Sequence, residues 1–272
     1  MCERGANTGR HSPQKTVNKR MRKLNQILKC LKLLSQKYNQ NAHVIILPVH
    51  LRELRQKFSP QYQHLSQSLI NSVSIFQRVP INSNCPLFIY GKDRGLITYR
   101  ACLNDLNLLS TLIRTIQELL KRTDSNFRGI DREDYFAQHY CIWCPYAQKP
   151  FLFRELQDDG EARLEFLRVN CSLWNRLSNI LRSVAPNVYK DFLQYPLPDK
   201  IEQLCSAWAG CVVNIPVHTK PHRDVKQSKF GYSCVVPAGD YTRDRLICYE
   251  LKLIIELAPE TCFFFPDSLI QK

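Results

Sequence analysis

Apolar residues recur every three or four positions along the segment 17–38. They are Val17, Met21, Leu24, Leu28 and Leu31. This spacing predicts a helix with one apolar face, because side chains three and four positions apart lie side by side on a helix. Most of the lysines and arginines of the segment fall outside that face. We therefore expect a basic amphipathic helix that buries its apolar side against the rest of the chain or a partner.

Helical periodicity returns in the first two thirds of the chain. Ser59-Pro60 interrupts one such segment, since the residue before a proline is disfavoured in helical backbone. The predicted helices cover residues 54–76, 104–121 and 166–184. Between the first two, the apolar runs 86–90 and 96–99 flank a four-residue turn that contains Gly95, which predicts a β-hairpin.

Beyond Trp208 the pattern changes to short runs rich in β-branched and aromatic residues. The runs are CVVNI, FGYSCVV, RLICYEL, KLIIEL and TCFFF. Strands of this length separated by turns favour a β-barrel or a sandwich. Residues 124–160 show neither period and are expected to be loop. The fold class is thus α+β, with helices first and a β-rich last third.

Charge adds a possible class of partner to this picture. Over 272 residues, 38 Lys and Arg stand against 24 Asp and Glu, a net charge of +14. Residues 1–60 hold 13 of the basic side chains and only two acidic ones. Such a concentration favours nucleic acid as a partner, with Lys19, Arg20, Arg22 and Lys23 as the candidate contacts, although a basic face can also be merely solvated.

The N-terminal region has no apolar stretch that resembles a secretion signal, and the run Val44 to Val49 is too short to cross a bilayer. We expect a nuclear or cytoplasmic protein that is neither secreted nor membrane-bound, with its twelve cysteines reduced. Cys141 and Cys144 have the spacing of half a zinc site. No second pair of this kind follows, and Cys205 and Cys211 stand singly, so we do not expect zinc there.

His222 and Asp224 are the strongest candidates for chemistry. On a strand, side chains two positions apart project from the same face, so an imidazole and a carboxylate can converge on one cation. A second histidine from elsewhere would complete the facial triad of non-haem Fe(II) oxygenases. His218 is one candidate for it, although Pro221 lies between the two histidines. By itself, however, His-X-Asp is a common tripeptide.

Four segments in chain order carry a resemblance that gives this tripeptide a context. They cover residues 214–224, 231–241, 246–257 and 262–270, preceded by APNVYKDF at 185–192. Together they resemble the core of the TET/JBP-like 2-oxoglutarate/Fe(II) dioxygenases, above all the set expanded in fungi. The resemblance implies a double-stranded β-helix (jelly-roll-like) core with flanking helices, Fe(II) and 2-oxoglutarate as cofactors, modified bases in nucleic acid as substrate, and His222 and Asp224 as metal ligands.

The chain also departs from that pattern. Lys272 stands where the family has its second metal-binding histidine, and an ammonium group has no lone pair for a metal. The usual Gly-Gly pair before the third segment is replaced by Arg243, Asp244 and Arg245. As written, we expect a basic helical region over residues 1–60 and an incomplete dioxygenase-like domain over 61–272, with its β-rich core at about 205–272. The chain is then an inactive or truncated enzyme. The alternative is a non-catalytic nucleic-acid-binding protein on an eroded dioxygenase scaffold.

Three aromatic residues flank the His-X-Asp tripeptide in the sequence. Trp208, Phe230 and Tyr232 have the chemistry to stack on a nucleic acid base, or they belong to the core of the strands.

Overall fold

The chain divides into two units, Met1–Ala42 and His43–Lys272. The computed structural model describes residues 42–56, 72–79, 85–122, 136–143, 151–152, 160–195, 197, 203, 205–215, 222, 224, 230–241 and 245–270. The predicted basic helix at 17–38 lies outside these residues. The domain boundary near residue 60 stays a prediction, while the strand β1 (His43–Ile46) and the helix α2 (Leu51–Gln56) are described as parts of the second unit.

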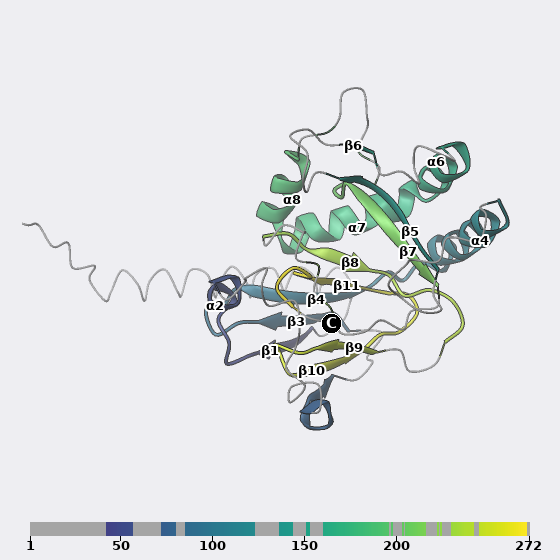
Figure 1. Ribbon diagram of the computed structural model, residues 1–272. Helices are drawn as coiled ribbons and strands as arrows, with labels where there is room; N and C mark the ends of the chain where they lie inside the picture. The colour runs from purple at the N-terminus through teal and green to yellow at the C-terminus, as the bar shows by residue number, and fades with distance from the viewer. Residues whose placement is uncertain are drawn as a thin grey trace, which may run out of the picture. The chain divides into compact units, whose positions relative to one another are not determined.

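A five-stranded sheet forms the centre of the second unit (Figure 1). Its strand order is β1-β3-β4-β11-β8. The predicted hairpin is confirmed as the antiparallel pair β3 and β4. Its strands beyond β1 are β3 (Leu87–Tyr90), β4 (Leu96–Cys102), β8 (Ser233–Val235) and β11 (Thr261–Phe265). The sheet therefore joins strands from both ends of the unit.

A second sheet has the order β2-β10-β9 and shares a core with the first. Its strands are β2 (Gln77–Val79), β9 (Arg245–Cys248) and β10 (Leu253–Glu256). Side chains from both sheets, among them Ile89, Phe263 and Ile255, are fully buried in one cluster. Burying so much apolar surface between two sheets is what holds them face to face.

The architecture is mixed α+β, as predicted, but the described strands form no closed barrel. The strands of the last third do not make the core alone, since β3 and β4 contribute some of its most buried residues, such as Leu87 and Ile97.

A third sheet, of order β6-β5-β7, lies partly in the segment of the chain that was expected to be loop. It is built from β5 (Phe136–Trp143), β6 (Phe151–Leu152) and β7 (Gly210–Ile215). In the paired strands β5 and β7, Tyr140 is opposite Cys211. The Tyr140 side chain is fully buried, with its ring 5.7 Å from that of Phe166 in a helix. The partner strand β7 is distant in sequence, which is why local pattern missed β5.

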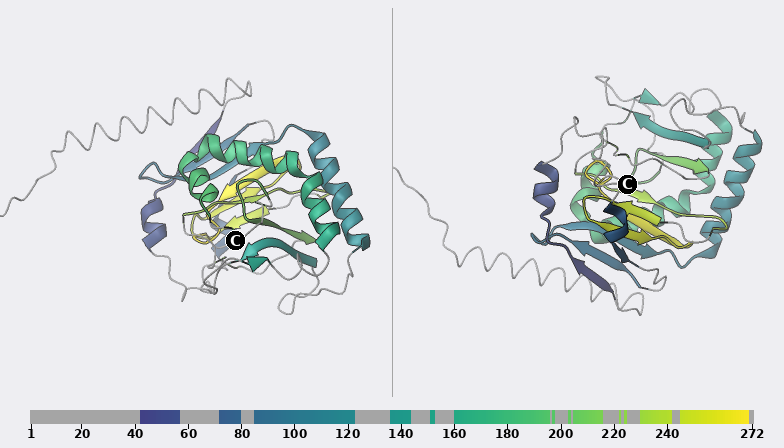
Figure 2. Two further views of the ribbon diagram at one scale, coloured as in Figure 1. Left: turned by 90° about the horizontal axis from the view of Figure 1, so that it is seen from above. Right: turned by 60° about the horizontal axis from the view of Figure 1, so that its bottom comes forward.

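The described part of the unit also contains four longer helices, which can be followed in Figure 2. They are α4 (Leu106–Arg122), α6 (Gly160–Val169), α7 (Cys171–Val184) and α8 (Pro186–Leu193). The predicted helix at 166–184 is thus two helices that meet at Asn170. Also described are α2 and the short 3-10 helix η1 (Ser72–Ile75), where one interrupted helix over 54–76 was expected.

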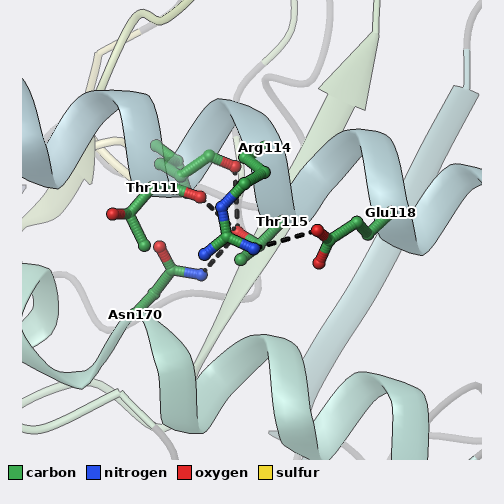
Figure 3. A network of polar contacts seen from close by, with 6 residues as sticks. Thr111, Arg114, Thr115, Glu118 and Asn170 are labelled. Atoms are coloured by element: carbon green, nitrogen blue, oxygen red, sulfur yellow. Dashed lines mark hydrogen bonds and ion pairs between the residues drawn. The ribbon is translucent and has the colours of Figure 1, made fainter.

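Asn170 joins these helices to α4 (Figure 3). Its Nδ2 atom donates hydrogen bonds of 2.8 Å to Thr115 Oγ1 and to the Phe166 carbonyl, and the Thr115 hydroxyl donates to the Thr111 carbonyl. Because Asn170 and Thr115 are both buried, these bonds fix the packing of α4 on α6 and α7. On the exposed side of α4, Arg114 pairs with Glu118 at 2.9 Å. No helix among the described residues has the length and apolar character that a bilayer crossing requires.

Candidate functional site

His222 and Asp224 lie near each other, and neither belongs to a strand, where the sequence predicted one. They lie in the connection between β7 and β8, and His222 Nε2 is 3.9 Å from Asp224 Oδ1. Both side chains are partly exposed, so the pair is open to small molecules. The two side chains approach each other without the strand alternation from which their convergence on a cation was predicted, and that convergence stays a prediction.

The turn after β11 anchors Asp224. The Asp224 backbone N–H donates a 3.3 Å hydrogen bond to the Asp267 carbonyl. The Asp267 side chain is buried and accepts a short hydrogen bond from the Ser233 hydroxyl on β8. Asp267 thus connects three segments: the His222–Asp224 connection, the start of β8 and the turn after β11. In the dioxygenase family that the sequence resembles, the second metal-binding histidine follows the strand that corresponds to β11.

The donor atoms fit a single divalent cation in part. Two ligand bonds of about 2.1 Å at a right angle place their donor atoms about 3 Å apart, so the observed pair needs to close by only about 1 Å. Among the described residues, no group of three or more His, Cys, Asp or Glu side chains is arranged to hold a metal ion. His222 and Asp224 would supply two of the three protein ligands of a facial triad, and no third ligand is assigned within the described part of the chain. We call the pair the metal half-site.

Several predicted site residues lie outside the described residues: Lys19, Arg20, Arg22, Lys23, Cys144, His218 and Lys272. Cys141 is half-buried in β5. Cys205 and Cys211, which stand apart in the sequence, are brought together. Hydrogen bonding to the Cys211 side chain, together with burial, raises the pKa of the Cys205 thiol well above its ordinary value.

Of the three candidate stacking residues, Tyr232 belongs to the core and Trp208 is half-buried against it. Tyr232 is buried, its hydroxyl donates to the Leu96 carbonyl, and burial raises the pKa of its phenol. Trp208 donates a 2.9 Å hydrogen bond to the Tyr232 carbonyl and packs on Phe264 at 6.1 Å between ring centroids. Phe230 differs, because half of its surface is exposed.

Asp93, in the turn of the β3–β4 hairpin, anchors the helix α2. Its carboxylate accepts hydrogen bonds from the backbone N–H groups of Leu51, Arg52 and Gly95 at 3.2 to 3.3 Å. Burial acts to raise the pKa of Asp93, but these three N–H donors, with His50 nearby, outweigh it and lower the pKa below its ordinary value. No sequence signal had marked this residue.

The lowered pKa predicts a pH dependence of stability. A carboxyl group whose pKa falls on folding stabilises the folded state above its unfolded pKa of about 3.9, and that contribution is lost as the pH falls through the lower, folded value. In Asp93→Ala we expect a loss of about 1–2 kcal/mol in the free energy of unfolding at pH 7, from unpaired N–H groups. Urea unfolding of the variant and the wild type at pH 7 and pH 3 measures the loss and its pH dependence. If the variant loses the same free energy of unfolding at both pH values, the assignment of a lowered Asp93 pKa is contradicted.

The fold is mixed α+β and TET-like, as comparison with a solved structure shows. The structure is similar to that of NgTET1, solved in complex with 5mC DNA, with a TM-score of 0.62. The two sequences are 13% identical, and the likeness covers 92% of this chain and 83% of NgTET1. At this identity the likeness concerns the fold alone. No protein-family model matches the sequence, and no significant match was found among curated proteins.

Proposed function

We propose that this protein is a nucleic-acid-directed, dioxygenase-like protein that uses the metal half-site of His222 and Asp224. The observation that carries the proposal is the approach of His222 Nε2 to Asp224 Oδ1, held by Asp267 at the end of β11. Two features support it: the TET-like fold and the order of the sequence segments around the pair. We further propose that the two sheets with a common core are the halves of a double-stranded β-helix.

Fe(II) with 2-oxoglutarate, when bound, supplies the oxidation of a C–H bond by dioxygen. The part of this chain in that chemistry is to present one neutral imidazole nitrogen and one carboxylate oxygen. Their partial exposure leaves room for a chelating acid beside them. A third protein ligand decides whether the chain turns over substrate, and none is assigned within the described residues.

Nucleic acid is the proposed partner, since the net charge of +14 is concentrated in the first 60 residues. A polyanion binds such a chain with an affinity that falls steeply with salt. The non-catalytic alternative shares this property, so binding of nucleic acid alone does not distinguish the two. Binding of metal does.

A cobalt titration of the full chain tests the metal half-site. We expect Co(II) to bind at one equivalent, with an absorption spectrum that changes on addition of 2-oxoglutarate, because a ligated Co(II) ion reports its donor atoms. His222→Ala and Asp224→Ala remove a donor each and are expected to abolish saturable binding.

The chain offers a matched control in His50. Its Nε2 atom lies 3.9 Å from Glu53 Oε1, the same separation as in the metal half-site, but at the start of the helix α2 and away from that site in the sequence. His50→Ala is expected to leave Co(II) binding unchanged. Absence of Co(II) binding in the wild type, with DNA binding intact, would refute the dioxygenase-like assignment and favour the non-catalytic scaffold. Equal loss in His50→Ala and His222→Ala would refute the location.

A further inference from the structure

Arg55 and Phe230 form a cation–π pair on the surface of the second unit. The Arg55 Cζ atom lies 5.0 Å from the centroid of the Phe230 ring. Half of the Phe230 surface is exposed, although its ring is large and apolar. An exposed aromatic ring with a guanidinium on it is an arrangement that favours recognition of a further flat or anionic group.

The pair is held in position from both sides. Arg55 is carried by α2, which the Asp93 carboxylate fixes at its first turn through the Leu51 and Arg52 N–H groups. Phe230 is followed, two residues on, by Tyr232, whose side chain is buried and hydrogen-bonded to β4. Each of the two residues is thus attached to a hydrogen-bonded element of its own. This favours a stacked arrangement that is already formed before a ligand binds.

The Arg55 guanidinium has capacity for a ligand. Its Nε atom is buried and has no hydrogen-bond partner among the described residues. The Arg55 residue as a whole is half-buried. The planar guanidinium offers donors in the geometry that phosphate oxygens accept.

Phe230 lies close along the chain to residues that anchor the metal half-site, whereas Arg55 comes from α2. Three residues after Phe230, the Ser233 hydroxyl bonds to Asp267, and the Asp267 carbonyl accepts from the Asp224 backbone. The start of β8 therefore links the Phe230 side of the pair to the turn that anchors Asp224.

We propose that Arg55 and Phe230 bind single-stranded nucleic acid. A base stacks on the exposed part of the Phe230 ring, and the adjacent phosphate accepts hydrogen bonds from Arg55. Stacking on an aromatic side chain beside a basic group is how proteins hold unpaired bases without reading their sequence. This inference rests on the nucleic-acid part of the proposed function and identifies unpaired bases as the form that is bound.

Fluorescence anisotropy with a labelled thymidine strand of about twelve nucleotides, within the site size of one such binding groove, tests the proposal on the full chain. We expect Phe230→Ala to weaken binding by about tenfold, in the range for loss of one stacked base, and Phe230→Trp to preserve it. Arg55→Ala is expected to weaken binding and to reduce the slope of log affinity against log salt by about one, as for one lost phosphate contact. Arg55→Lys keeps the charge without the planar fork and is expected to restore the slope.

Two controls separate this site from general effects. Ile75→Ala removes another exposed apolar side chain, and Arg114→Ala removes a basic residue that pairs with Glu118 on α4. Neither is expected to change affinity for the strand. If Phe230→Ala binds as the wild type does, or if Ile75→Ala weakens binding equally, the proposal is overturned.

Co(II) binding distinguishes failure of this proposal from failure of the proposed function. Phe230→Ala and Arg55→Ala are expected to bind Co(II) as the wild type does, and His222→Ala to keep its affinity for the strand. A chain that binds no cobalt but loses strand affinity in Phe230→Ala supports the stacking site and refutes the metal half-site. The opposite pattern refutes the stacking site and leaves the metal half-site supported.

Discussion

Asp267→Ala is expected to weaken Co(II) binding by about tenfold to one hundredfold, although Asp267 is not proposed as a ligand. Residues that orient metal ligands without touching the metal have effects of this size. Asp267 is 4% exposed, and it accepts the Ser233 hydroxyl through its side chain and the Asp224 N–H through its carbonyl. Removal of the carboxylate leaves Ser233 without this partner and frees the turn after β11 to shift, and with it Asp224. The Co(II) titration described above measures the effect.

The matched variants for this test are Asp267→Asn and Asp240→Ala. Asparagine keeps an oxygen that accepts from Ser233, so most of the affinity for Co(II) is expected to remain. Asp240 is exposed, and its removal changes the net charge by the same amount without touching β11. Because Asp267→Ala is also expected to cost about 1–3 kcal/mol in the free energy of unfolding, its fold is checked by urea unfolding first. Full Co(II) affinity in a folded Asp267→Ala variant would show that the turn does not position the half-site.

The sequence predicted those parts of the fold that local pattern determines. The hairpin of β3 and β4 and the helix α4 are confirmed because each is specified by its own periodicity and turn residues. The strand β5 was missed, since its pairing with β7 depends on residues far along the chain. The helix at 166–184 was predicted as continuous because the apolar period runs through Asn170, whose side chain instead bonds to Thr115 and to the Phe166 carbonyl.

The candidate site divides in the same way. The nearness of His222 and Asp224 could be predicted from the sequence because residues two positions apart form a local motif, while their role as ligands stays a prediction. Phe230 was named as a candidate stacking residue without its partner Arg55, and Asp267 was not marked at all, since both partnerships are contacts with a distant segment. A lone buried aspartate has no signature of function in a sequence. The resemblance to dioxygenases supplied the order of the strands but not these contacts.

The common element of the two proposed sites is the start of β8. The Phe230 ring precedes it, Tyr232 fixes it to β4, and Ser233 bonds it to the turn after β11. The start of β8 therefore links the proposed stacking residue to the turn that anchors Asp224. If both proposed sites hold, mutation of Phe230 and mutation of His222 are expected to separate nucleic acid binding from metal binding.

Gly210→Ala is expected to destabilise the protein by about 3 kcal/mol or more, the upper range for overpacking of a closely packed site. A Cβ atom at Gly210 would lie 2.2 Å from the Tyr140 carbonyl oxygen and 2.3 Å from Cys141 Cα. Both are backbone atoms of the paired strand β5, so no side chain can rotate away and the two strands have to separate. Since β7 leads directly into the His222–Asp224 connection, Co(II) affinity is expected to fall as well.

Gly239→Ala is the control for this change. At Gly239 an alanine is disfavoured by the backbone conformation, whereas at Gly210 it is disfavoured by lack of space. Gly239 has a φ of +104°, and no atom lies within 4 Å of the place that an alanine methyl group would take. Alanine there costs only backbone strain, about 1–2 kcal/mol. Urea unfolding at one pH compares the two variants. If Gly210→Ala lowers the free energy of unfolding no more than Gly239→Ala does, β5 and β7 separate easily. The close approach of the two strands at Gly210 would then contribute little to stability.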